Sequence, residues 1–362
     1  MATKTAFTKI THPAPTPAAV RDVALADPGF GKLFSDHMVS IDWSETQGWH
    51  NAVIGPRGPI ALDPAAAVLH YAQEIFEGLK AYRFADGGTA LFRPDANARR
   101  FNDSARRLAM AELPEDLFIG AIRELVAADH DWFPSVEGGS LYLRPFMIAT
   151  EAFLGVRPAK EYKFIVIASP AGNYFKSGAP AVSIWVSDYT RAAPGGTGAA
   201  KCGGNYAASL VPTAEAFARG HDQVLFLDAA QHKCVEELGG MNLFFVFDDG
   251  TMITPPLGGT ILPGITRDSL LTLATEQGLT IREEPYSIDQ WRDDAASGRL
   301  TEAFACGTAA VVTSVGKVAG RDGEFIIGSG GPGQLTQRLR QRLVSIQRGE
   351  APDPHGWMMR LD

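Results

Sequence analysis

One lysine, Lys201, lies in the run GGTGAAKCGGNYAASL, residues 195–210, among glycine and alanine. An ordinary lysine has a pKa near ~10.4 and is protonated at neutral pH, so it is not a nucleophile. It becomes one when burial or a nearby cation favours the neutral amine. Small neighbours supply no carboxylate to hold the proton, and they let a planar group approach the backbone. The pattern suits a buried Schiff-base lysine, and an exposed lysine in a loop is the ordinary alternative.

Two carboxylates, Glu236 and Glu237, enter an apolar strand-like run in CVEELGGMNLFFVF. A carboxylate at the start of a buried strand is costly unless a cationic or donating group meets it. The pyridine nitrogen of pyridoxal phosphate is such a group, because a carboxylate keeps it protonated and makes the ring an electron sink. We therefore predict that Glu237, rather than Glu236, binds this nitrogen, with Tyr206 reaching the same cavity. A cap or a surface ion pair is the ordinary alternative.

A phosphate group would need donors, and three segments offer them. LPGITRDSL places Gly264, Ile265 and Thr266 at the start of a helix, where backbone N–H groups and the helix dipole favour an anion. ACGTAAVV forms a small-residue turn with the hydroxyl of Thr308 as a donor. Arg100 in NARRFNDSARRL could add a paired charge. Each feature is commonplace alone, and the set predicts a phosphate site.

Composition limits the class of protein. The length of 362 residues suits two domains, which typically run to ~100–200 residues each. A net charge of −8 argues against nucleic acid as a partner, because phosphate binding needs clustered Lys and Arg. The N-terminus lacks the apolar core of a signal peptide, and no window approaches the ~20 apolar residues of a membrane span. We expect a cytoplasmic protein without a membrane partner.

Several motifs point away from other chemistry. The three cysteines lack CxxC spacing and the histidines form no HExxH, so we expect free thiols and no metal site. No GxSxG or Walker-type loop occurs. GSGGPG, residues 328–333, fits GxGxxG literally but lacks the following strand and acidic residue of a dinucleotide site, so it predicts a tight glycine connection.

The order of predicted elements divides the chain into two lobes. Residues 1–174 form an α+β lobe with a Pro-rich start, mobile to about residue 28; residues 175–181 are a linker; residues 182–362 form a lobe dominated by a sheet or barrel. In the first lobe we expect strands at 36–45, 58–64, 140–150 and 163–170, a hairpin at 80–94 and helices at 97–108 and 114–130. In the second we expect strand-rich runs at 181–188, 223–230, 242–254, 279–287 and 302–319 and helices at 266–278, 289–297 and 334–349.

Together these residues resemble a known family. The chain is similar to a fold-type IV pyridoxal-phosphate aminotransferase, and more closely to a branched-chain amino-acid aminotransferase. The similar segments include FSDHMVSIDWSETQGWHNA, LHYAQEIFEGLKAYR, SLYLRPFMIATEAFLGVRP, GGTGAAKCGGNYAASL, EELGGMNLFFVF and HGWMMRLD, in the family's order over nearly the whole chain. The resemblance implies a smaller N-terminal α/β lobe and a larger, β-rich pseudo-barrel lobe that binds the cofactor.

The resemblance also implies residue roles. Lys201 matches the catalytic Schiff-base lysine, Tyr206 the tyrosine near the cofactor's phenolic oxygen, and Glu237 the partner of the pyridine nitrogen. The other implied cofactor-binding residues are Arg100, Gly240, Met241, Asn242, Gly264, Ile265, Thr266, Gly307 and Thr308. The implied substrate-binding residues are Phe30, Tyr71, Phe76, Tyr142, Arg144, Tyr174, Thr308, Ala309 and Ala310.

Two positions depart from vertebrate members of the family. Gly240 stands where they have threonine, and their redox CxxC falls on Ala310–Thr313 here, so we expect no thiol switch of that kind. The implied reaction is amino transfer from L-leucine, L-isoleucine or L-valine to 2-oxoglutarate by a homodimer with small-molecule substrates. A D-amino-acid aminotransferase, an aminodeoxychorismate lyase of the same fold, and a non-catalytic binding protein are the rival hypotheses.

Overall fold

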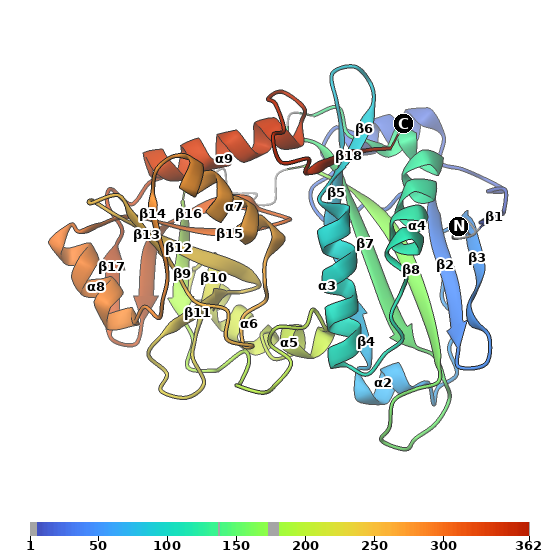
Figure 1. The fold of residues 1–362 in the computed structure, drawn as a ribbon, viewed down its shortest axis with the longest axis horizontal. Helices are drawn as coiled ribbons and strands as arrows, with labels where there is room; N and C mark the ends of the chain where they lie inside the picture. The colour runs from blue at the N-terminus through green and yellow to red at the C-terminus, as the bar shows by residue number, and fades with distance from the viewer. Residues whose placement is uncertain (1–5, 137, 173–180, 362) are drawn as a thin grey trace. The chain divides into compact units, whose positions relative to one another are not determined.

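The computed structural model describes residues 6–136, 138–172 and 181–361, which fold into two compact units (Figure 1). The first unit comprises Met1–Tyr174, Ala200–Gly203 and Gln347–Asp362, and the second comprises Phe175–Ala199 and Gly204–Ile346. The sequence had placed everything after residue 181 in one lobe. The difference arises because the last strand pairs with a strand of the first unit, and because Phe76 N–H donates to the Lys201 carbonyl at 2.9 Å. The predicted linker falls almost wholly outside the described residues.

A mixed sheet forms the first unit. Its strands run in the order β1-β3-β2-β8-β7-β5-β6-β18, and β4 pairs with β7. Phe164, Ile165 and Val166 are consecutive and fully buried, so both faces of β8 are covered. The strands are β1 (Thr8–Lys9), β2 (His37–Ser44), β3 (Gly48–Pro56), β4 (Glu74–Phe76), β5 (Leu79–Arg83), β6 (Thr89–Phe92), β7 (Ser140–Ala149), β8 (Glu161–Ala171) and β18 (Met358–Arg360).

Two long helices, α3 (Pro94–Arg107) and α4 (Glu115–Ala128), pack beside this sheet and confirm the predicted pair (Figure 1). Pro94 starts α3 at a position where the missing N–H costs nothing. The rings of Phe101, Phe118 and Phe164 meet at 5.4–5.9 Å between centroids, which joins both helices to β8. The short helices of this unit are α1 (Ala18–Leu25), α2 (Ala67–Tyr71) and the 3-10 turn η1 (His130–Trp132).

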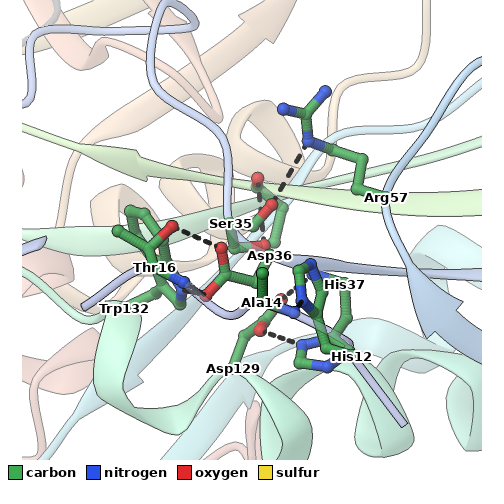
Figure 2. A network of polar contacts seen from close by, with 10 residues as sticks. His12, Ala14, Thr16, Ser35, Asp36, His37, Arg57, Asp129 and Trp132 are labelled. Atoms are coloured by element: carbon green, nitrogen blue, oxygen red, sulfur yellow. Dashed lines mark hydrogen bonds and ion pairs between the residues drawn. The ribbon is translucent and has the colours of Figure 1, made fainter. Parts of the chain in front are cut away.

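A network of polar contacts fastens the N-terminal segment to this unit (Figure 2). The carboxylate of Asp36 accepts the N–H of Thr16 at 3.1 Å, its hydroxyl at 2.6 Å and the indole N–H of Trp132 at 3.2 Å. The buried Asp129 accepts the backbone N–H of His37 at 3.1 Å and contacts its ring Nδ1 at 2.7 Å. Together with the pairing of β1 with β3, these contacts hold the Pro-rich start, which was expected to be mobile, against the first unit from Thr8 onward.

Six strands of the second unit close into a barrel. The sheet order is β11-β10-β9-β16-β15-β12-β13-β14, and an additional pairing of β11 with β12 joins the ends of the first six. β17 pairs with β16. The strands are β9 (Val182–Val186), β10 (Gln223–Leu227), β11 (Val235–Leu238), β12 (Met241–Phe247), β13 (Thr251–Thr254), β14 (Thr280–Glu283), β15 (Leu300–Gly307), β16 (Val311–Gly320) and β17 (Gly323–Ile326).

An aromatic core supports the β12 side of this barrel. The ring centroid of Phe245 lies 4.6 Å from that of Tyr286 and 4.7 Å from that of Trp291. Ser287 and Gln290 form a capping box that starts the helix carrying Trp291. The helices are α5 (Gly203–Ala207), α6 (Leu210–Ala218), α7 (Ile265–Glu276), α8 (Ile288–Ser297) and α9 (Gln334–Gln347). The three predicted helices, α7, α8 and α9, are confirmed.

Three local results qualify the sequence-based assignment. The predicted strand at residues 58–64 is wrong, because β3 ends at Pro56 and the prolines at 59 and 64 have no N–H for a ladder. The helices α1, α2, α5 and α6 were not predicted. GSGGPG forms the predicted tight connection, in which Gly328 and Gly330 have φ of 51° and 79°. Among the described residues, no helix is both long enough and apolar enough to cross a membrane.

Candidate active site

The first unit fixes Lys201 through its backbone and its neighbours. Its N–H donates to Oγ of Ser104 on α3 at 2.9 Å, and its Nζ lies 5.0 Å from the ring centroid of Phe76. Ala200 and Cys202, on either side, are buried in the core of this unit with 4% and 2% of their surface exposed. The lysine is therefore held by packed residues, which argues against the alternative of a lysine in a mobile loop.

The glycines before the lysine serve a close backbone contact. A Cβ on Gly198 would lie 2.3 Å from the carbonyl oxygen of Thr260, so only glycine fits there. Asn205 closes the same stretch, because its Nδ2 donates to the carbonyl of Thr197 at 2.8 Å and its Oδ1 lies 2.7 Å from that residue's hydroxyl. The sequence had assigned these glycines to the approach of a planar group, whereas at Gly198 the neighbour is backbone.

Arg100 is paired with a carboxylate that the sequence analysis missed. Its Nε donates to Oε1 of Glu77 at 2.7 Å and its Nη2 to Oε2 at 2.9 Å. Both side chains are buried, and Gly78 N–H adds a third hydrogen bond to Glu77 at 3.1 Å. Nothing in the letters FEGLKAYR separates a buried glutamate from an exposed one. The phosphate-binding role of Arg100 stays a prediction.

Four of the predicted substrate residues lie together in the first unit. The rings of Phe30 and Tyr142 meet edge to face at 5.0 Å, and Arg144 donates to the Tyr142 hydroxyl at 3.0 Å. The Arg144 guanidinium also lies 4.7 Å from the ring centroid of Phe76. A Cβ at Gly78 would be 2.1 Å from the Tyr142 hydroxyl, so glycine lets this tyrosine approach. The result is an aromatic cluster with one cation.

Two other predicted substrate residues are not part of that cluster. Tyr71 is 38% exposed, its ring lies 6.5 Å from that of Phe153, and its hydroxyl donates to the carbonyl of Leu154. Tyr174 lies outside the described residues. From the sequence alone, the position of Tyr71 outside the cluster could not be predicted, because no local pattern distinguishes it from the aromatic residues that form the cluster.

In the second unit, Glu237 lies on β11 with 2% of its side chain exposed. Its Oε1 accepts the N–H of Leu262 at 2.8 Å. Its Oε2 forms an ion pair with Nε of Arg191 at 3.0 Å, although the angle is poor for a hydrogen bond. The sequence analysis missed Arg191, which lies in a turn-rich segment without a strand or helix pattern. The buried, charge-paired state of Glu237 argues against the surface alternative.

The start of α7 suits an anion. Its N-cap is Gly264, and within the described part of the chain no side-chain cap bond is found at this helix start, where the N–H groups of Ile265 and Thr266 lie. Asn242 holds the preceding loop by donating to the carbonyl of Leu262 at 3.0 Å. A Cβ at Gly264 would lie 2.0 Å from Oδ1 of Asn242, so the loop requires glycine there.

Two glycines of the second unit make room for larger neighbours. A Cβ at Gly240 would lie 3.3 Å from the Tyr206 ring, so a threonine at this position would need that ring to move slightly. A Cβ at Gly307 would lie 3.4 Å from Cγ of Met241. Gly307 ends β15 and begins the turn that carries the predicted residues Thr308, Ala309 and Ala310.

Strain marks the end of that turn. Val311 pairs with the last residue of β15 and has φ of 62°, which a β-branched residue rarely adopts. Burial raises the pKa of the Cys306 thiol one residue before the turn, so this group stays a neutral thiol. In the first unit, burial also raises the pKa of Glu74, whose carboxylate accepts the N–H of Gly203.

Comparisons with known proteins identify the family. The amino-transferase class IV family model matches residues 74–318. A branched-chain-amino-acid aminotransferase of Mycolicibacterium smegmatis is 58% identical over 361 residues, covering 98% of both chains. One from Mycobacterium tuberculosis is 56% identical over 360 residues, again covering 98% of both.

Solved structures agree with these relatives. The branched-chain amino acid aminotransferase of Escherichia coli gives a TM-score of 0.74 at 29% identity, covering 90% of this chain and 100% of that one. The enzyme from Thermobaculum terrenum in its PLP-bound holo form gives 0.71 at 25%, covering 89% and 98%. This chain therefore belongs to the class IV aminotransferases, with the fold-type IV fold that the sequence predicted. Within that family, its relatives at 56% and 58% identity are branched-chain-amino-acid aminotransferases.

Proposed function

We propose that the protein transfers the amino group of L-leucine, L-isoleucine and L-valine to 2-oxoglutarate, with pyridoxal phosphate as its cofactor. The products are branched 2-oxo acids and L-glutamate. The observation that carries this proposal is the 58% identity to a branched-chain-amino-acid aminotransferase over 98% of both chains. No observation favours the D-amino-acid aminotransferase, the lyase or the binding protein.

The residues present fit this cofactor. The glycine N-cap of α7 leaves the Ile265 and Thr266 amides for a phosphate, with Thr308 and Arg100 as the other proposed donors. The buried Glu237 carboxylate suits a protonated ring nitrogen. The other proposed cofactor contacts are Tyr206, Gly240, Met241, Asn242, Gly264 and Gly307.

Lys201 is the proposed catalytic residue of the chain. When bound, the cofactor supplies a ring that withdraws electrons from the substrate Cα. Lys201 would be the residue that holds the cofactor, and its amine would then act as the general base that removes the substrate Cα proton and as the general acid that returns a proton. Hydrogen bonds of its backbone with Ser104 and Phe76 fix the point from which this side chain extends.

The aromatic cluster of the first unit suits the substrates. Phe30, Phe76 and Tyr142 offer apolar walls to a branched side chain. The Nε of Arg144 is buried and has no hydrogen-bond partner among the described residues, so it is a donor that a substrate carboxylate would satisfy. One methylene changes binding by only ~1–3 kcal/mol, so activity on the three amino acids should overlap.

We also propose that the protein is a homodimer. Around Tyr71, the first unit exposes Leu69 at 58%, Leu154 at 66% and Val156 at 89%. The hydrogen bond from Tyr71 to the Leu154 carbonyl and the backbone bridge between Ala66 and Ala152 link the two segments that carry them. Apolar residues gathered in this way are typical of an interface, and a second copy of the chain would cover them. Sedimentation of the purified protein with Val156→Asp as a variant tests this: the variant should be a monomer.

The cytoplasmic location stays a proposal. All three cysteines of the chain are free thiols, as is usual in a reducing compartment. Fractionation of the native cell tests it, and recovery with secreted or membrane proteins would contradict it.

Two assays test the function. The purified protein should form L-glutamate from L-leucine and 2-oxoglutarate, and should not accept D-alanine. Borohydride reduction followed by peptide mass spectrometry should place the cofactor on Lys201. The Lys201→Ala variant should lose both the label and the activity, while binding of the cofactor to another lysine, or activity with D-alanine instead of L-leucine, would overturn the proposal.

A further inference from the structure

Two consecutive buried carboxylates of β11 contact the same loop of the second unit. Adjacent residues of a regular strand point to opposite faces. Here the pairing of β10 with β11 shifts register: Leu227 pairs with Val235 and Phe226 with Glu237, so Glu236 is the extra residue of a β-bulge. The bulge explains how Glu236 reaches Thr260 while Glu237 reaches Leu262, two residues further along.

Among the described residues, Arg191 is the arginine seen in an ion pair with this site, and its partner there is Glu237. The Arg191 side chain is 5% exposed and its Nε lies 3.0 Å from Oε2 of Glu237. Its Nη2 donates to the carbonyl of Thr260 at 2.5 Å and lies 3.4 Å from that of Gly198. These two carbonyls fix the guanidinium, so the cation cannot move to the other carboxylate without breaking them.

Glu236 receives much less support. Its Oε1 accepts the hydroxyl of Thr260 at 2.6 Å, and its Oε2 is buried with no hydrogen-bond partner among the described residues. A buried anionic oxygen without a donor is costly, whereas the same oxygen costs less when it carries a proton. Burial raises the pKa of Glu236; the Thr260 hydroxyl and the charge of Arg191 oppose this, and the charge of Asp228 adds to it. Burial and the charges of Asp228 and Glu236 raise the pKa of the nearby Cys234 thiol.

We propose that Glu236 is a neutral carboxylic acid at neutral pH, and that Arg191, locked on Thr260, is the positioning residue that keeps Glu237 ionised. The single positive charge of the loop then balances a single negative charge. The inference rests on the proposed function, in which the Glu237 carboxylate meets the cofactor's ring nitrogen. Glu236 contributes shape and a hydrogen bond without adding a second charge beside that carboxylate.

Infrared difference spectroscopy tests the two charge states without requiring amino transfer. The full-length protein, with isotope-labelled glutamate carboxyls, is measured at neutral pH before and after the cofactor is removed. Glu236→Gln should lose one protonated-carboxyl band, whereas Glu237→Gln should lose one carboxylate band. Glu77→Gln is the matched control, because that buried glutamate is held by Arg100 and should also lose a carboxylate band. Loss of a carboxylate band in Glu236→Gln would overturn the proposal.

A second pair of variants tests the role of Arg191. Arg191→Gln should gain a protonated-carboxyl band, as Glu237 takes up a proton, and Arg191→Lys should restore the carboxylate. A purely structural arginine would change the melting temperature of both variants and leave the spectrum alone. That result would contradict the proposal. If Arg191→Gln does not fold, the infrared spectrum of Arg191→Lys is recorded over a pH titration instead. A lysine should form a weaker ion pair with Glu237, so this carboxyl group should ionise at a higher pH than in the wild type.

The two proposals fail separately. A wild-type protein that carries the predicted bands but transfers no amino group would remove the proposed function alone. A working aminotransferase with an ionised Glu236 would remove this inference alone.

Discussion

Two buried arginine–carboxylate sites of the molecule differ in how charge is balanced. In the first unit, Arg100 and Glu77 form a fork at 2.7 and 2.9 Å, one cation to one carboxylate. In the second unit, Arg191 lies 3.0 Å from Glu237, while Glu236 accepts a hydrogen bond from a neutral hydroxyl. A one-to-one pair needs both members to be charged. Where two buried carboxylates share one cation, ionising the second carboxylate costs free energy that no partner offsets. The positions of the donors therefore decide which carboxylate is ionised.

The difference is visible in the donors. Glu77 accepts two guanidinium N–H groups and one backbone N–H, which suits a stable structural anion. Glu237 accepts a backbone N–H and faces a guanidinium that is held by carbonyls of other residues. The second arrangement holds the Glu237 carboxylate in position without a pair of parallel hydrogen bonds from one guanidinium.

The largest effect should come from breaking the fork. Glu77→Leu leaves the Arg100 charge buried and should lower the free energy of unfolding by about 3–5 kcal/mol. Adding Arg100→Met should restore much of that loss, because no unpaired charge is left. Denaturant unfolding of both variants measures this, and a double variant that loses the sum of the two single effects would show that the pair is not a unit.

Removing the charge of Glu237 should affect catalysis more than folding. Glu237→Gln should lower kcat for L-leucine by on the order of 10²–10³-fold, the range found when one preorganised electrostatic group is removed. Steady-state assays with saturating cofactor measure it. A variant within tenfold of wild type would mean that the carboxylate is not the partner of the reacting group.

The hydroxyl of Thr260 sharpens the comparison at a smaller scale. Thr260→Val removes the hydroxyl that donates to Oε1 of Glu236 at 2.6 Å. The loss of this hydrogen bond should lower the free energy of unfolding by about 1–3 kcal/mol. Thr260→Ser keeps the hydroxyl and should cost much less. A loss of stability that is larger in Thr260→Ser than in Thr260→Val would assign the effect to the packing of the methyl group instead, because valine keeps that methyl and serine does not.

A carboxylate bound chiefly by neutral donors gives the smallest effect. Burial opposes the ionisation of Asp36, but hydrogen bonds from Thr16 and Trp132 outweigh it and hold the pKa below its ordinary value of 3.8. Because the folded pKa is lowered, the carboxylate stabilises the fold above that value, and this contribution is lost as pH falls through the folded pKa. Asp36→Asn should therefore cost about 1 kcal/mol at pH 7. The variant should match wild type in strong acid, and a difference that persists there would contradict the assignment.

Local patterns made much of the fold predictable. The alternation in β2 and the helical spacing of α4 follow directly from which residues are buried, and the hairpin of β5 and β6 follows from Asp86 and two glycines. The apolar residues between the prolines at 59 and 64 suggested a strand, but the two prolines prevent one from forming there.

The pairing of the buried charged residues could not be predicted from the sequence. Both carboxylates of this run are buried, as their apolar surroundings in the sequence suggested, and the role of Glu237 at the cofactor stays a prediction. The bulge at Glu236 depends on pairing with β10, which no local pattern encodes. Arg191 and Glu77 find their partners 46 and 23 residues away, so their charges look solvated in the sequence alone. Burial of charged groups is decided by tertiary packing.

The central claim is that Lys201 and Glu237 serve one amino transfer on branched-chain amino acids. Its most direct test is the visible absorption spectrum of the cofactor-loaded protein, recorded alone, after L-leucine and after 2-oxoglutarate. We predict a band that fades with L-leucine and returns with 2-oxoglutarate, and that is absent in Lys201→Ala. A protein that stays colourless after incubation with pyridoxal phosphate, or a band that ignores L-leucine and responds to D-alanine, would contradict the account.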